Sequence, residues 1–180
     1  MKKILYTAQS DIVLKKLKSQ NCVYVKKKYI EKKYGEKISK NIFIAYNWFV
    51  NEFKKRVDKP NLAEYPFWLF EDKNYAKTYG SSNLLKVNVD NSKIVLFDNH
   101  KWERVLSLNY VGNSLKEEKE FDKKLKKYGL QTGLDVFNSP LHIKLQKEIK
   151  ESFKKIFEID KNSTLRAASW SLKKDWIDSL

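Results

Sequence analysis

The sequence predicts an α+β fold: a single domain over residues 1–180 in which short, mostly antiparallel strands form a small split sheet packed by four or five helices. Three observations lead to this prediction. Short apolar runs are scattered along the chain, amphipathic helical patterns lie between them, and no internal repeat or low-complexity linker divides the 180 residues. Hydrophobic residues make up 42% of the chain, which is enough for a globular core.

The first half of the chain is predicted to hold two strands and two helices, with a basic segment between the helices. Residues 39–57 give a clear helical signal, because apolar side chains recur there at three- and four-residue spacing. The predicted elements are, in order, a strand at 4–6, a helix at 11–18, a short extended piece at 22–25, a loop or exposed helical turn at 26–40, a long helix at 39–57 and an aromatic strand at 65–70.

The second half is predicted to hold a strand pair, three helices and a final strand. The segments 83–90 and 92–98 resemble a hairpin, because Asp90-Asn91-Ser92 makes a plausible turn between them. The other elements are a helix at 98–106 capped by Asp98, a helix at 114–129 with a Ser114–Glu117 capping box, a loop at 129–138, a helix at 139–157 that starts at Ser139-Pro140, and a strand at 164–172.

The charge is the strongest feature of the composition. The chain has 37 basic residues against 22 acidic ones, a net charge of +15. Such an excess attracts polyanions, and nucleic acid is the usual candidate. An acidic protein partner and a merely solvated basic surface are the alternatives. Only Arg56, Arg104 and Arg166 are arginines, so bidentate recognition of phosphates or bases is expected to be sparse.

Several classes of protein are excluded or disfavoured. Cys22 is the only cysteine, and His100 and His142 lack metal-ligand spacing, so we expect neither a disulfide nor a bound metal. No apolar stretch approaches the ~20 residues of a membrane helix, and polar residues from Gln9 onward interrupt any signal-peptide core, so we expect a cytoplasmic protein with no membrane partner. The chain has no glycine-rich phosphate loop.

The polar corner Tyr6-Thr7-Ala8-Gln9 is the first candidate site. It offers two hydroxyls and an amide where a strand meets a helix N-terminus, and helix N-termini favour phosphates. A phosphate-bearing ligand is therefore one interpretation of these residues. The other is structural: Thr7 ends a strand, and Gln9 or Ser10 caps the following helix.

Two further clusters are candidates. In the segment 98–104, His100 is a candidate acid or base and Arg104 a candidate phosphate contact, whereas Asp98 is interpreted as a helix N-cap. Arg166 shares a strand face with residues 168 and 170, which is unusual for a dry core. The aromatic candidates for stacking on a base or a nicotinamide ring, more often core residues, are Tyr65, Phe67, Trp68, Trp170 and Trp176.

Four segments of the chain carry a resemblance to a known family. They are ILYTAQS, YPFWLF, LLKVNVDNSKIVLFDNHKWERVLS and LRAASWSLKKDWI, in this order. Together they resemble an uncharacterised bacterial family, domain of unknown function 3841, over nearly the whole chain. The family has no established activity, so this resemblance implies no function.

The opening strand is also similar to that of the ADP-ribosyltransferase superfamily, whose small α+β domains bind NAD in a cleft between two short sheets. Those domains often begin with a strand that ends in a Tyr-Thr or His-Thr pair, which LYTAQS looks like. Their last strands usually carry a catalytic Glu or Gln. The comparable strand here carries Arg166 instead, so another residue, such as Gln131 or Glu71, would have to fill that role.

Two functional hypotheses follow. The first is an NAD-dependent ADP-ribosyltransferase-like enzyme of bacterial or phage origin that acts on a nucleic acid or a nucleic-acid-associated target. The second is a non-catalytic basic module that binds nucleic acid, or an accessory protein that binds an acidic partner. In the enzyme hypothesis the catalytic candidates are Gln9 and Arg166, and the NAD-binding candidates are Tyr6, Thr7, Tyr65, Trp68 and Arg104. In the binding hypothesis the lysine-rich stretches are 26–40, 54–59, 116–127 and 144–155.

Overall fold

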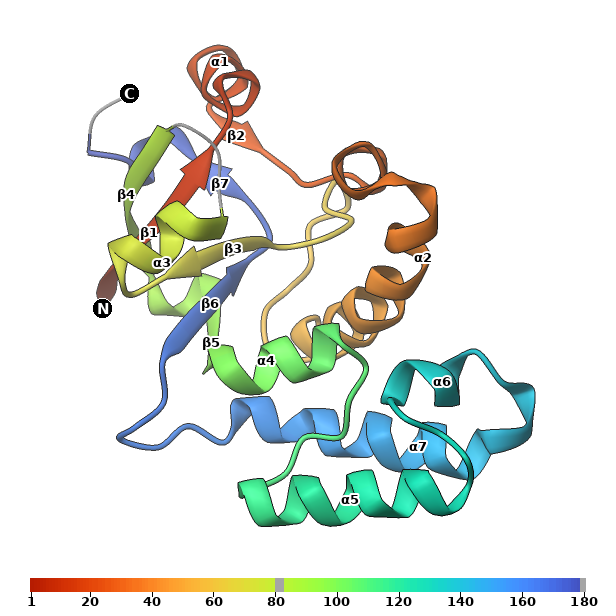
Figure 1. The fold of residues 1–180 in the computed structure, drawn as a ribbon. Helices are drawn as coiled ribbons and strands as arrows, with labels where there is room; N and C mark the ends of the chain where they lie inside the picture. The colour runs from red at the N-terminus through yellow and green to blue at the C-terminus, as the bar shows by residue number, and fades with distance from the viewer. Residues whose placement is uncertain (80–82, 179–180) are drawn as a thin grey trace. The chain divides into compact units, whose positions relative to one another are not determined.

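A computed structural model describes residues 1–79 and 83–178. It confirms the α+β prediction: the described residues form seven α-helices, a five-stranded sheet and a two-stranded sheet (Figure 1). The chain divides into two compact units, which we describe separately. Unit 1 comprises residues 1–33, 50–96 and 165–180, and unit 2 comprises residues 34–49 and 97–164. The single domain over 1–180 stays a prediction.

The five-stranded sheet has the strand order β4-β1-β3-β6-β5. Its pairings of β1 with β3 and β4, and of β3 with β6, are antiparallel. The strands are β1 (Lys2–Gln9), β3 (Phe67–Phe70), β4 (Asn83–Asp90), β5 (Ile94–Asp98) and β6 (Leu165–Ser169). Strand β5 begins in unit 1 and ends in unit 2.

Unit 1 also contains α1 (Asp11–Gln20), α3 (Lys73–Tyr79) and a small sheet of β2 (Cys22–Val23) and β7 (Leu172–Lys173). Helix α3 lies beside β1 and β3 (Figure 1). One face of the large sheet is the core of the unit, and its buried residues include Leu5, Leu17, Leu69, Val87 and Ala167. The alternation of apolar and polar residues along β1 and β4 places Leu5 and Val87 on that face, and Leu17 of α1 packs against it.

Unit 2 is helical and is built around aromatic side chains. Its complete helices are α4 (Asn99–Leu106), α5 (Leu115–Lys127), α6 (Gly133–Phe137) and α7 (Ile143–Ser152). The central residue is Trp102, which is fully buried, with ring centroids 5.1 Å from Phe49 and 5.8 Å from Phe97. The apolar side of α4 therefore packs on aromatic side chains of α2 and β5 at this cluster.

Helix α2 (Lys27–Phe53) has residues in both units, and its extent shows that one prediction is wrong. The stretch 26–40, expected as a loop or exposed turn, belongs to this helix almost entirely. Gly35, with φ 75° and ψ 163°, interrupts it, and such a conformation is open to glycine at little cost. This part of the helix was not predicted because the lysine-rich segment has few apolar residues before residue 38.

The predicted hairpin of 83–90 with 92–98 is wrong. The two segments are β4 and β5, which lie at opposite edges of the sheet. The partner of β4 is β1, in register from Lys2–Asp90 to Gln9–Asn83. Asp90 does cap a turn, by accepting a hydrogen bond from the Ser92 amide at 2.9 Å, but that turn sends the chain across the sheet.

An α-helix is present within each of the five segments expected to be helical, and two short helices were not expected. Two of the expected bounds are wrong: α2 ends at Phe53 rather than at 57, and the segment 139–157 is α7 with 3-10 turns at Pro140–His142 and Phe153–Phe157 on either side. Helix α3 follows the aromatic strand, and α6 occupies the predicted loop at 129–138. A reciprocal capping box between Thr132 and Asp135 starts α6. The box expected at Ser114 forms only in part, because the Glu117 carboxylate accepts from the Asn113 amide rather than from that of Ser114.

Candidate functional site

The large sheet separates between β1 and β3 close to the polar corner. In the described residues a single register pair, Tyr6 with Phe70, joins these two strands. One residue further on, the Thr7 hydroxyl donates to the Trp68 carbonyl at 3.0 Å, and the Gln9 amide donates to the Thr7 hydroxyl at 2.8 Å. The Thr7 hydrogen bond thus continues the contact between the strands where the ladder stops, and Gln9 holds the Thr7 hydroxyl from within β1.

Arg166 lies on β6 among aromatic rings. Its side chain is only 3% exposed. The guanidinium carbon is 5.0 Å from the ring centroid of Trp68, 4.6 Å from that of Phe70 and 4.9 Å from that of Tyr79. Contacts of this kind offset part of the cost of removing a cation from water. The sequence singled out Arg166, and the structure shows that α3 contributes one wall of its surroundings.

The strand register places the corner residues on two faces of the sheet. Tyr6 lies opposite Phe70, and Phe70 lies opposite Arg166, so these three side chains share one face. Thr7 and Gln9 alternate with them: Thr7 is on the other face, and Gln9 follows it at the two-residue period. The structure therefore brings Tyr6, Trp68 and Arg166 to one face and separates the two catalytic candidates, Gln9 and Arg166.

The remaining candidates lie elsewhere. Tyr65 precedes β3, forms a bridge with Val25 and is 7% exposed; burial raises the pKa of its phenol. Arg104 belongs to unit 2, where its Nε donates to the Tyr110 carbonyl at 2.8 Å and lies 3.0 Å from a Glu118 carboxylate oxygen. Its guanidinium thus holds together the segment that connects α4 to α5.

The other proposed acid–base and stacking residues have structural contacts. Asp98 caps α4, as interpreted, by accepting from the Lys101 amide at 2.9 Å. The His100 ring lies 3.3 Å from the Thr164 hydroxyl. Glu71 pairs with Lys3. Trp170 is buried and stacks on Phe53, its ring centroid 4.1 Å away, which is the core role that aromatic residues usually have.

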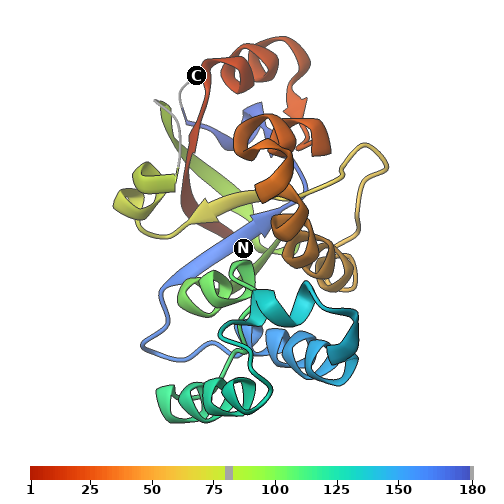
Figure 2. The same cartoon turned by 45° about the vertical axis from the view of Figure 1, so that its right-hand side comes forward.

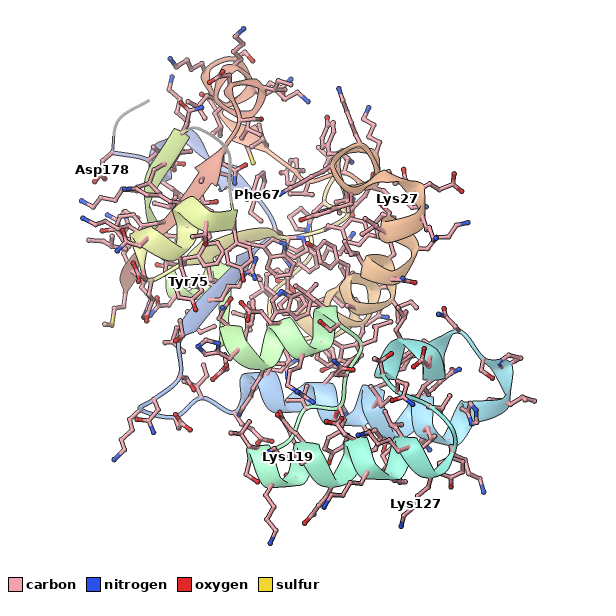
Figure 3. All side chains as sticks on the ribbon, in the orientation of Figure 1. Lys27, Phe67, Tyr75, Lys119, Lys127 and Asp178 are labelled. Carbon is pink, nitrogen blue, oxygen red and sulfur yellow. The ribbon has the colours of Figure 1, made fainter. Side chains whose placement is uncertain are left out.

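A second surface of unit 1 concentrates positive charge. Residues 15–33 contain eight lysines and one acidic residue, an excess of seven positive charges. The lysines lie on the second half of α1, before α2 and on its first turns, and we call this the α1–α2 lysine surface. In Figure 3 Lys27 marks where α2 begins. The lysines are Lys15, Lys16, Lys18, Lys26, Lys27, Lys28, Lys32 and Lys33.

The pKa of Tyr29 reflects the positive charge of this surface. The Lys16 ammonium donates to the Tyr29 hydroxyl at 2.6 Å, so a side chain of α1 reaches the first turn of α2; Figure 2 shows both helices. This hydrogen bond lowers the pKa of the Tyr29 phenol, and the charges of Lys16, Lys28 and Lys26 add to the effect. Local positive potential thus stabilises a negative group here.

Sequence reasoning found only part of this surface. The lysine-rich stretches predicted for binding include 26–40 but not Lys15, Lys16 and Lys18. Their spacing along a helix expected at 11–18 was the available signal. What was missing is the contact between Lys16 and Tyr29, which places the two lysine groups together.

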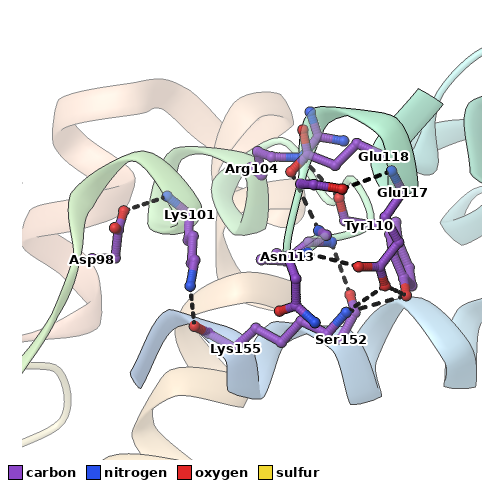
Figure 4. Close-up of polar contacts among 12 residues, drawn as sticks. Asp98, Lys101, Arg104, Tyr110, Asn113, Glu117, Glu118, Ser152 and Lys155 are labelled. Carbon is purple, nitrogen blue, oxygen red and sulfur yellow. Dashed lines mark hydrogen bonds and ion pairs between the residues drawn. The ribbon is translucent and has the colours of Figure 1, made fainter. Parts of the chain in front are cut away.

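Unit 2 contains a polar network that ties α5 to the 3-10 turn after α7 (Figure 4). The Glu117 carboxylate accepts from the Lys155 ammonium and from the Tyr110 hydroxyl, each at 2.6 Å. The Lys155 bond, then the Tyr110 and Asn113 bonds, lower the pKa of Glu117 to about 2. The Tyr110 ring also stacks on Phe121 with centroids 4.2 Å apart.

This network predicts how stability depends on pH. The folded pKa of Glu117 lies below its ordinary value of 4.5, so its contribution is complete above pH 4.5 and is lost as the pH falls toward about 2. We expect Glu117→Gln to lower the free energy of unfolding at pH 7 by about 0.5–1 kcal/mol, because the carboxylate is partly exposed to water. The difference from wild type should vanish near pH 2. Urea unfolding at both pH values measures it, with the exposed Glu120→Gln as control; a difference that persists unchanged at pH 2 would contradict the assignment.

Two further findings concern metal ligands and membrane spans among the described residues. Within 1–79 and 83–178, no group of three histidine, cysteine, aspartate or glutamate residues is arranged to hold a metal ion. None of the helices described is both long enough and apolar enough to cross a membrane. A cytoplasmic location stays a prediction.

The fold and its surfaces define an α+β protein with one strongly basic surface and one aromatic–arginine cluster. The chain belongs to the family designated domain of unknown function 3841, whose family model matches residues 4–178. This confirms the first of the two resemblances. No curated protein and no solved structure matches the chain.

Proposed function

We propose that this protein binds nucleic acid through the α1–α2 lysine surface. The observation that carries the proposal is the density of charge: eight lysines and a single acidic residue within residues 15–33. Six of these lysines are exposed, and Lys16 and Lys26 are half-buried. Lysines that neutralise phosphates release condensed counterions, and this release drives binding without reading the sequence.

The contacts of the three arginines support binding to the sugar–phosphate backbone of the nucleic acid rather than to its bases. Arg166 is buried among rings, and Arg104 pairs with Glu118. Arg56 donates to the Glu52 carbonyl at 2.7 Å and to its carboxylate at 3.0 Å. Lysine acts as a point charge, whereas bidentate readout of guanine is mainly a property of arginine. We therefore expect affinity with little sequence preference.

A salt titration tests this proposal. A fluorescently labelled 20-nucleotide single strand and its duplex are titrated with the full chain, and anisotropy gives Kd at several salt concentrations. With six to eight phosphate contacts, affinity should fall about a thousandfold between 50 and 200 mM salt. Binding that is absent at 50 mM, or that does not respond to salt, would contradict the proposal; retention of an acidic polypeptide alone would favour an acidic protein partner.

A second candidate function is NAD-dependent ADP-ribosyl transfer, with NAD held where the sheet separates between β1 and β3. It is supported by the single register pair between these strands and by Thr7, Gln9 and Trp68 beside it. Tyr6 and the buried Arg166 lie on the opposite face from Thr7, beside the rings of Trp68 and Phe70. The reaction would release nicotinamide and join ADP-ribose to a nucleic acid or an associated protein. The late strand carries Arg166 where such enzymes carry an acid or an amide, which is why we place this function second.

The enzyme hypothesis predicts a loss of turnover in a corner variant. We expect Thr7→Val combined with Gln9→Ala to reduce nicotinamide release from NAD about a hundredfold or more, the scale of losing positioned polar contacts. Release is measured with the purified chain alone and with added RNA or DNA. Ser10→Ala is the control, because the Ser10 side chain makes no capping hydrogen bond to α1. Unchanged release in the double variant, or none from the wild-type protein under any condition, would remove the hypothesis.

A further inference from the structure

Unit 2 has a hollow of about 380 Å³ on its surface, and its lining joins an aromatic ring to three lysines. Trp48 comes from α2, and Lys147, Lys150 and Lys154 come from α7 and the 3-10 turn after it. The lysines are spaced three and four residues apart, so they follow one side of the helix. Glu151 is the acidic residue of the lining.

Trp48 is held in place but is not fully covered. Its ring meets the edge of Phe153 with centroids 5.2 Å apart and stacks on Phe157 at 6.3 Å with 27° between the planes. Its side chain is half-buried, unlike that of Trp102, which is completely buried. The rings behind Trp48 fix its orientation. Because the Trp48 side chain is already ordered, little conformational entropy would be lost when a ligand stacks on it.

The charges around Trp48 favour an anion. Lys147 lies 3.9 Å from the Glu151 carboxylate, but both side chains are exposed, at 77% and 63%, so this pair is weak. The Lys150 ammonium lies 5.5 Å from the ring centroid of Phe137. The Gln146 amide donates to the carbonyls of Val136 and Ser139, at 3.0 Å each, and anchors the wall of the hollow. The lining therefore has two positive charges in excess and one aromatic surface.

We infer that this hollow binds a single-stranded segment of nucleic acid, with an unpaired base stacked on Trp48 and the flanking phosphates at Lys147, Lys150 and Lys154. Aromatic rings beside cations are what single-strand-binding proteins use, because every base has a face to stack. A duplex keeps its bases stacked within the helix, so it gains only the phosphate contacts. This inference rests on the proposed binding of nucleic acid and assigns it a strand preference.

The test compares two variants on three probes by anisotropy: an oligothymidine single strand, the same strand with abasic positions, and a duplex. Trp48→Leu should weaken binding of oligothymidine about five- to hundredfold, the range of one lost stacking contact. It should change affinity for the abasic strand and the duplex less than twofold. Trp48→Phe, which keeps a ring against Phe153 and Phe157, should recover most of the loss.

Each other outcome overturns the inference in a distinct way. Equal losses on all three probes would mean that Trp48 acts through folding or phosphates. No loss on oligothymidine, with salt-dependent binding intact, would remove the stacking site and leave the proposed function standing. Failure of the wild-type chain to bind any probe at 50 mM salt would overturn both.

Discussion

Replacing four lysines of the α1–α2 lysine surface should abolish most of the affinity for nucleic acid. The variant changes Lys15, Lys18, Lys28 and Lys32 to Gln; all four side chains are exposed. Each phosphate contact contributes about 0.7 to the dependence of log K on log salt for a single strand. Losing four contacts should therefore lower the slope by about 3 and the affinity at 0.1 M salt by about two to three orders of magnitude.

A matched control separates this surface from net charge. Lys116, Lys119, Lys123 and Lys127 are also exposed lysines on one helix, α5, and changing them to Gln removes the same charge. In Figure 3 Lys119 and Lys127 are labelled on α5. Acidic residues lie between them in the sequence, so we expect less than a tenfold loss. Equal losses in the two variants would show that binding follows net charge alone and would contradict the assigned surface.

The second large effect is expected in the core of unit 2. Trp102→Ala should lower the free energy of unfolding by about 3–5 kcal/mol, the usual cost of truncating a buried aromatic side chain. Trp102 is fully buried, and its ring also stacks on Tyr46 with centroids 6.0 Å apart. Urea unfolding followed by circular dichroism measures the change.

Two variants make that measurement specific. Trp102→Phe keeps an aromatic ring in the cluster and should lose less than Trp102→Ala. Leu141→Ala, at a side chain that is 85% exposed, should change stability by less than about 0.5 kcal/mol. A loss below about 1 kcal/mol in Trp102→Ala would mean that the aromatic cluster does not organise unit 2.

Local signals in the sequence predicted local structure well. The helix at 98–106 was expected because an aspartate precedes an amphipathic segment, and α4 begins one residue after Asp98, which caps it. Alternation predicted that Arg166 shares a face with residues 168 and 170; β6 runs from Leu165 to Ser169, so it bears this out for residue 168, whereas Trp170 lies beyond the end of the strand. Both conclusions depend only on residues close together in the chain.

The sequence did not predict which distant segments pair as neighbouring strands. The prediction of a hairpin at Asp90 was wrong because β4 pairs with β1 and not with β5. Packing across the whole sheet determines this pairing. The separation of Gln9 from Arg166 has the same origin. Which face a residue occupies relative to another strand is fixed by register, and the register of β1 against β3 rests on the single pair of Tyr6 with Phe70.

Photocrosslinking tests the central claim most directly. An oligothymidine containing 4-thiothymidine is irradiated with the full chain at 50 mM salt, and the crosslinked peptides are identified by mass spectrometry. We expect crosslinks in residues 15–33, at the exposed Tyr29 in particular, and their loss in the four-lysine variant. Crosslinks that lie wholly outside residues 15–33, or that persist at full yield in that variant, would contradict the proposal that the α1–α2 lysine surface binds nucleic acid.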